Sequence, residues 1–151
     1  MNGMFLASLV HVFHWVVILF VLLAPFLNVP SILILHITFN LSLIVHWVNN
    51  NNVCSLSLLE SKLRGLDYTE SLTHKFISPI YDMSKTTWSN ICYLVTILLT
   101  MISGYLLYHS PQWKIVNTCI QQLKQSNEYM NAALLEKTKL YIECLKPLFT
   151  I

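Results

Sequence analysis

Four histidines lie within or at the ends of two apolar runs that carry no charged residue: His11, His14, His36 and His46. Ionisable side chains are costly inside a bilayer, so they are functional candidates wherever such runs span a membrane. Histidines on facing helices can hold a haem, and a haem- or quinone-linked redox site would use His11, His14 and His46. We favour neutral histidines that hydrogen-bond to polar neighbours, with His36 and Asn40 joining helices. Because the runs contain almost no glycine to make room for a haem, we expect no cofactor.

The cysteines show no pattern of a metal site. Cys54, Cys92, Cys119 and Cys144 form no C-x-x-C pair and no ligand spacing with histidine. Cys119 and Cys144 are expected to be too far apart on one helix to bridge each other. Cys54 and Cys92 flank the same membrane face, so a disulfide between them is the alternative. Free thiols are the favoured interpretation.

The sequence also lacks the motifs of common enzymatic sites. It contains no nucleophile elbow, phosphate-binding loop, paired-carboxylate arrangement or zinc-protease signature. The formal net charge is +2, and no basic cluster exceeds two neighbouring cations. Nucleic-acid binding needs a stronger basic patch. The sequence therefore predicts a protein that is not an enzyme and that does not bind nucleic acid.

Three charge-free apolar runs are long enough to cross a bilayer: residues 4–24, 30–48 and 88–108. A helix needs roughly 20 apolar residues to cross the hydrocarbon core, and the composition of 55% hydrophobic and 11% charged residues agrees. No Lys or Arg precedes the first run and no small-x-small site follows it, so we expect a retained span and not a signal peptide. The chain is predicted to be an all-α integral membrane protein in a lipid bilayer.

These runs divide the chain into a transmembrane hairpin (1–48), an interfacial linker (49–87), a third transmembrane helix (88–109) and an amphipathic helical tail (110–151). With three spans, the N-terminus and the linker share one side of the membrane, and the tail lies on the other. The linker holds four cations and is denser in charge near its spans, whereas the tail holds five spread over its length. The positive-inside rule then slightly favours the linker inside and the tail outside.

The linker is expected to contain a short interfacial helix. Ser57 followed by Glu60 matches a capping box at a helix start, and Gly65 can adopt the left-handed conformation that ends a helix. We expect its leucines to lie in lipid and Glu60 in water, with Arg64 directed to headgroups or to a carboxylate. A second apolar group, within 72–80, is expected to lie on the membrane similarly.

The tail is predicted to form one helix, from Pro111 after an N-cap at Ser110 to a stop at Pro147. Apolar residues at alternating spacings of four and three form a heptad seam along it, interrupted by Asn127 and Lys137. A helix resting on lipid or on its own spans is the alternative. The narrow seam favours a protein partner, which we expect to contact Ile120, Leu123, Met130, Leu134 and Tyr141.

The linker resembles the signature C-P-L-T-x-L-E-x-x-L-R of a family of small predicted membrane proteins with members in bacteria and in large DNA viruses. The matching residues are Cys54, Leu56, Leu59, Glu60, Leu63 and Arg64. Ser55 and Ser57 replace the proline and threonine of the signature, and His36 stands where the family has a histidine in its second span. The resemblance covers roughly residues 30–85. It implies a multi-span membrane protein, in a family with no known activity.

The leading functional hypothesis is a structural membrane component of a larger assembly. Because the family resemblance includes viral sequences, its most specific form is a virion membrane or minor capsid protein that anchors the shell of a large DNA virus to its internal membrane. This form rests on analogy. A subunit of an organellar or respiratory complex is the runner-up, and the histidine-based redox protein is the alternative from another class.

Overall fold

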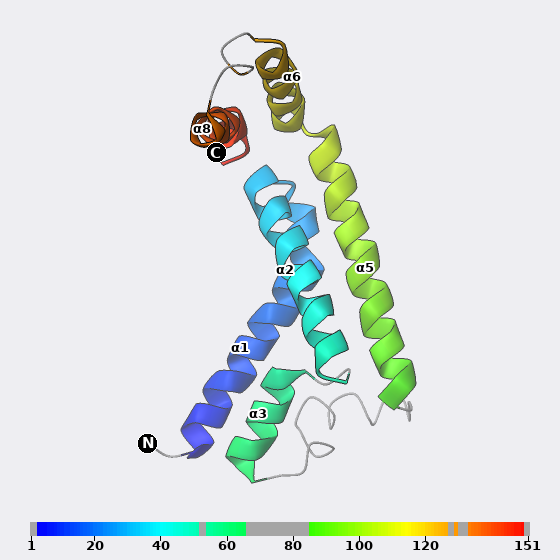
Figure 1. Ribbon diagram of the computed structural model, residues 1–151. Coiled ribbons are helices and arrows are strands. Elements are labelled where there is room, and N and C mark those ends of the chain that lie inside the picture. Colours follow the sequence, from blue (N-terminus) through cyan, green and yellow to red (C-terminus); the bar gives the residue numbers. More distant parts are fainter. Residues whose placement is uncertain (1–2, 52–53, 66–84, 127–128, 130–132, 150–151) are drawn as a thin grey trace.

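The computed structural model describes residues 3–51, 54–65, 85–126, 129 and 133–149 (Figure 1). Within these ranges the elements are helices and there is no strand, as predicted. The elements are α1 (Gly3–Leu23), η1 (Ala24–Leu27), α2 (Pro30–Asn49), α3 (Ser55–Arg64), α5 (Lys85–His109), α6 (Pro111–Gln125), α8 (Leu134–Leu145) and η3 (Lys146–Leu148). The second apolar group expected within 72–80 lies outside the described residues.

Three of these helices are long and apolar enough to cross a membrane: Met4–Leu27, Pro30–Asn49 and Ser89–His109. They match the three predicted runs within a few residues. Only 17%, 17% and 11% of their most apolar windows are buried inside the molecule. Most of their apolar side chains therefore face outward, which is the arrangement that lipid contact favours.

The three apolar helices do not pack as a simple hairpin plus a third span. Helices α1 and α2 meet near η1 and then diverge, so that α1 packs mainly on α3 and α2 packs mainly on α5 (Figure 1). The buried face of α1 carries Ala7, His14 and Val21, which are spaced seven residues apart and so share one side of the helix. Helix α1 is thus held by different partners along its length.

Helix α3 departs from the predicted interfacial helix at its start and on its buried face. It begins at Ser55, and its N-cap residue Cys54 makes no side-chain cap hydrogen bond, so the predicted capping box of Ser57 and Glu60 is wrong. Glu60 is fully buried, and therefore the prediction that it faces water is also wrong. The predicted end is confirmed: Gly65 has φ 68° and its N–H donates to the carbonyl of Lys62.

The tail begins as predicted but does not continue as one helix. The Ser110 hydroxyl accepts a hydrogen bond of 3.1 Å from the Trp113 N–H, which caps α6. Helix α6 ends at Gln125, and Ser126 has extended backbone angles, with φ −78° and ψ 139°. The backbone is again extended at Ala133, just before α8. The continuous helix is therefore a wrong prediction, because this interruption lets the tail fold back on itself.

A disulfide between Cys119 of α6 and Cys144 of α8 closes this tail hairpin. The prediction that these two cysteines could not pair is wrong, because it depended on the continuous helix. Cys54 and Cys92 are free thiols, as favoured. Helix α8 is seen end-on in Figure 1 while α2 and α5 are seen lengthwise, so α8 runs across the direction of the apolar helices.

Candidate functional site

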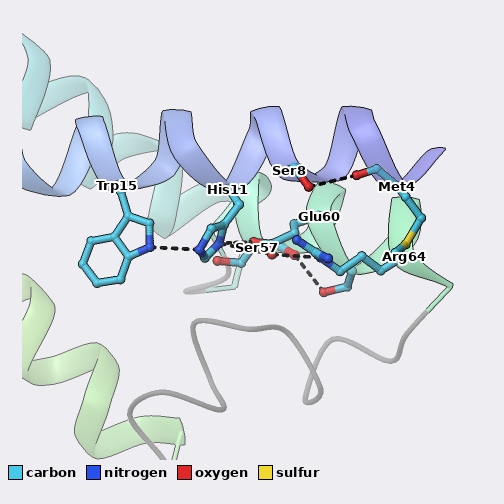
Figure 2. Close-up of polar contacts among 8 residues, drawn as sticks. Met4, Ser8, His11, Trp15, Ser57, Glu60 and Arg64 are labelled. Carbon is cyan, nitrogen blue, oxygen red and sulfur yellow. Dashed lines mark hydrogen bonds and ion pairs between the residues drawn. The ribbon is translucent and has the colours of Figure 1, made fainter. Parts of the chain in front are cut away.

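A cluster of charged and polar side chains joins α1 to α3, and we call it the α1–α3 cluster: His11, Trp15, Glu60 and Arg64 (Figure 2). Each helix contributes two residues four apart, which places both on one face. Arg64 Nε donates to Glu60 Oε1 at 3.1 Å. The ring nitrogen Nδ1 of His11 lies 3.2 Å from the same oxygen. Glu60 is fully buried, so these contacts replace the water that its carboxylate loses.

The hydrogen bond from Trp15 determines the protonation of His11. The indole N–H can only donate, and it lies 3.0 Å from His11 Nε2. Nε2 therefore accepts, so the proton of His11 is on Nδ1 and is donated to Glu60. The imidazole is neutral in this arrangement, and the Glu60 charge is balanced by Arg64. The cluster is a chain of satisfied hydrogen bonds, in which the Glu60 carboxylate is occupied by two donors.

A thiol and a histidine form a second contact between the same helices. Cys54 Sγ lies 3.7 Å from His14 Nε2. His14 is only 8% exposed, and its Nδ1 has no hydrogen-bond partner among the described residues. Burial of Cys54 raises its pKa, but the His14 side chain and the first backbone amides of α3 outweigh this effect, so the pKa lies below its ordinary value. The contact with His14 therefore makes the Cys54 thiol easier to ionise than a free cysteine.

A separate network in the apolar helices is centred on His36, which is fully buried. His36 Nε2 lies 3.0 Å from the Val21 carbonyl oxygen of α1. In a regular helix that carbonyl accepts from the N–H of residue 25, but this residue is Pro25, which has no N–H. His36 supplies the missing donor. The Ser103 hydroxyl of α5 lies 2.8 Å from His36 Nδ1, so one neutral imidazole joins three helices.

Asn40 extends this network between α2 and α5. Its side-chain nitrogen donates to the Thr100 hydroxyl at 3.0 Å, and the Thr100 hydroxyl donates in turn to the Thr96 carbonyl at 2.7 Å. The prediction that His36 and Asn40 make hydrogen bonds between helices is confirmed. We call His36, Asn40, Thr100 and Ser103 the three-helix network.

The residues of the family-like motif separate into two groups. Cys54, Glu60 and Arg64 face α1, and Arg64 meets a carboxylate, one of its two predicted targets. Leu56 and Leu63 are half-buried, and Leu59 is exposed. The redox candidates have separate protein contacts: His11 with Glu60, His14 with Cys54, and His46 Nε2 with the N–H of Ser55 at 3.3 Å.

The predicted partner-binding residues of the tail are also divided. Ile120 and Leu123 are half-buried on α6, and the Tyr141 hydroxyl lies 3.1 Å from that of Tyr129. Leu134 is 83% exposed, and Met130 lies outside the described residues. Leu135 and Ile142, which are 69% and 55% exposed on α8, were not among the residues of the predicted seam. Their spacing of seven residues was the available signal.

The pairing of His11 with Glu60 was missed because the two residues are 49 positions apart in the chain. A local signal existed, since His11 and Trp15, like Glu60 and Arg64, are spaced by four residues. That spacing shows which residues share a helix face, but it does not show which faces meet. Comparisons with protein-family models, curated proteins and solved structures give no match to this chain.

Proposed function

We propose that the chain is an integral membrane protein with a structural, non-enzymatic role in a larger assembly, spanning the bilayer through α1, α2 and α5. The length, hydropathy and low internal burial of these helices support the membrane location. An isolated apolar surface of this extent would associate in water. In a bilayer the same apolar surface contacts lipid chains and does not need to associate.

The polar side chains of the apolar helices favour a structural role and not a redox role. His36 uses both ring nitrogens for contacts with α1 and α5, and His11 uses both for Trp15 and Glu60. Interhelical hydrogen bonds of this kind stabilise helix packing in membranes. A haem ligand needs a ring nitrogen that is free for the iron, and neither His36 nor His11 has one.

The tail surface is the observation that carries the proposal of a partner. We define it as Leu134, Leu135 and Ile142, three large apolar residues exposed on α8. The disulfide from Cys144 to α6 holds this helix in place outside the apolar helices. A surface that is ordered before binding costs less entropy on association. We propose that another protein of the assembly covers the tail surface.

The virion membrane or minor capsid role is the most specific form of this proposal, and it rests on the family resemblance of the segment from Cys54 to Arg64. A subunit of an organellar or respiratory complex uses the same tail surface and is the second form.

The test is to place charge on the tail surface in the full chain. Leu135→Lys combined with Ile142→Lys should release the protein from its assembly, because two desolvated cations oppose burial against a partner. The measurement is the size of the particle that contains the tagged chain after mild detergent extraction, with two differently tagged copies to detect self-association.

The matched control adds the same charge to exposed polar positions on α6, with Asn117→Lys and Gln121→Lys. This control should remain in the assembly. If the wild-type chain is extracted alone, or if the α8 variant stays in the large particle, the tail surface does not bind a protein partner. A helix that rests on lipid would then explain the exposed leucines.

A further inference from the structure

Cys54 stands at a helix start where a thiol is not among the preferred residues. It is the N-cap residue of α3, where Ser, Thr, Asp and Asn are preferred because their oxygens accept from the first amides. Its sulfur makes no full cap hydrogen bond, although the amides of Leu56 and Ser57 are near enough to lower its pKa. The Sγ atom instead lies 3.7 Å from His14 Nε2, across the contact between α3 and α1.

His14 contributes the second observation. A histidine that is 8% exposed normally has hydrogen bonds on both nitrogens, yet Nδ1 has no partner among the described residues. Its one hydrogen-bond contact there is with the Cys54 thiol. A buried base beside a thiol at the start of a helix is the environment that generates a nucleophilic thiolate.

The location of the pair indicates the kind of electrophile. Ser55, next to Cys54, contacts His46 near the end of α2, so the thiol lies level with the boundary of that span. Beside this pair, Phe13 precedes His14 on α1 and Leu58 lies one turn after Cys54 on α3, and both side chains are exposed. A thiol at this level meets molecules that have an apolar chain in the lipid and a polar reactive group at its surface.

We propose that Cys54 is an acylation site that takes a fatty acyl group from a long-chain acyl thioester, with His14 as the base. His14 Nε2 accepts the Cys54 thiol proton, and the sulfur attacks the thioester carbonyl carbon. A new C–S bond forms, the original C–S bond breaks, and the leaving thiolate takes the proton from His14. The exchange of one thioester for another needs no oxidant or reductant. The proposal rests on the proposed membrane location of α1 and α2 and is independent of the proposed tail partner.

The other titratable groups near the thiol are His46 of α2, through Ser55, and the Cys92 thiol of α5. Cys92→Ala therefore serves as the background, since Cys119 and Cys144 are bonded to each other and Cys54 is then the one free thiol. The full chain in phosphatidylcholine vesicles is incubated with palmitoyl-CoA. We expect one palmitoyl group on Cys54, located by mass spectrometry and released by neutral hydroxylamine.

His14→Gln should lower the initial rate of transfer at least about tenfold, since general bases contribute about 100-fold or more. His109→Gln, at the far end of α5, is the matched control and should leave the rate unchanged. A second measurement needs no change at His14: alkylation of Cys54 by iodoacetamide should reach half its maximal rate at a lower pH than for a free cysteine peptide. Equal rates in His14→Gln, palmitate on Cys92 in the wild type, no transfer at all, or an ordinary pH profile would each overturn the proposal.

Discussion

At the scale of single residues, one missing hydrogen explains the position of His36. Pro25 ends α1 but leaves the Val21 carbonyl without its helical donor, and an unsatisfied carbonyl costs several kcal/mol in a membrane. His36 offers an N–H to that oxygen and an acceptor to Ser103. The histidines and Asn40 could be predicted as hydrogen-bonding residues from their types alone. Their partners could not, because the sequence does not show how the helices are rotated.

Removing this donor should destabilise the packing of the three apolar helices. We expect His36→Leu to cost more than Ser103→Ala, because only His36→Leu leaves the Val21 carbonyl unpaired. Interhelical hydrogen bonds in membranes are worth about 0.6 kcal/mol and up to about 1.7, so Ser103→Ala should lie in that range. The measurement is reversible unfolding in mixed micelles. Ser42→Ala is the control, since the Ser42 hydroxyl donates within its own helix. Equal costs for the two network variants would contradict the assignment.

Substitution of Glu60 distinguishes two roles of this residue, because a helix cap and a buried ion pair predict different losses of stability. A lost cap costs about 0.5–2 kcal/mol, whereas breaking a buried ion pair on one side costs about 3–5 kcal/mol. We expect Glu60→Ala to reduce the free energy of unfolding by about 3 kcal/mol, because Arg64 and His11 lose their acceptor. The double variant with Arg64→Ala should cost less than the sum of the single variants.

The control for this cycle is Lys62→Ala, which removes an exposed cation of the same helix. It should change stability by less than about 0.5 kcal/mol, as surface substitutions usually do. Additive costs for Glu60 and Arg64 in the same unfolding assay would show that the two side chains are not coupled.

At the scale of elements, length and composition predicted the apolar helices well, whereas periodicity predicted the tail poorly. A span needs only length and apolar composition, and both are visible in the sequence. In the predicted heptad seam of the tail, Asn127 was a polar interruption of one continuous helix. Ser126, just before it, ends α6, and its hydroxyl accepts from the Tyr129 N–H at 3.2 Å, as Ser does in turns. The neighbouring Ser and Asn were a turn signal that the longer repeat obscured.

The tail disulfide should hold α6 against α8 without affecting the apolar helices. The two cysteines are 25 residues apart, and closing a loop of this size is worth about 3 kcal/mol in the chain-entropy account. We expect Cys119→Ser with Cys144→Ser to speed amide hydrogen exchange in both tail helices and to leave α2 and α5 unchanged. Cys92→Ala, which removes a thiol but no disulfide, is the control. Faster exchange across the whole chain would show that the tail supports the entire fold.

At the scale of the whole molecule, the cysteines differ between its two ends. The disulfide lies in the tail, beyond the end of α5, whereas the free thiols Cys54 and Cys92 lie at the start of α3 and near the start of α5. If α5 spans a membrane, these two groups are on opposite sides of it. Sequence charge favoured the linker inside only slightly, because cations are present on both sides. The disulfide adds an independent argument about membrane orientation. This argument could not be made from the sequence, because the pairing of Cys119 with Cys144 depends on how the tail folds.

Disulfides persist in oxidising compartments, and thiols stay reduced where glutathione and thioredoxin act. We therefore predict that the tail faces an oxidising compartment and that the linker faces the cytosol, the orientation that the cations Lys62 and Arg64 also favour. In sealed cells or vesicles of known orientation, a membrane-impermeant maleimide should label Cys119 from the tail side, and only after reduction. It should label Cys54 only after the membrane is opened. Labelling of Cys54 from the oxidising side would reverse the topology and would place the tail surface, with any partner, in the cytosol.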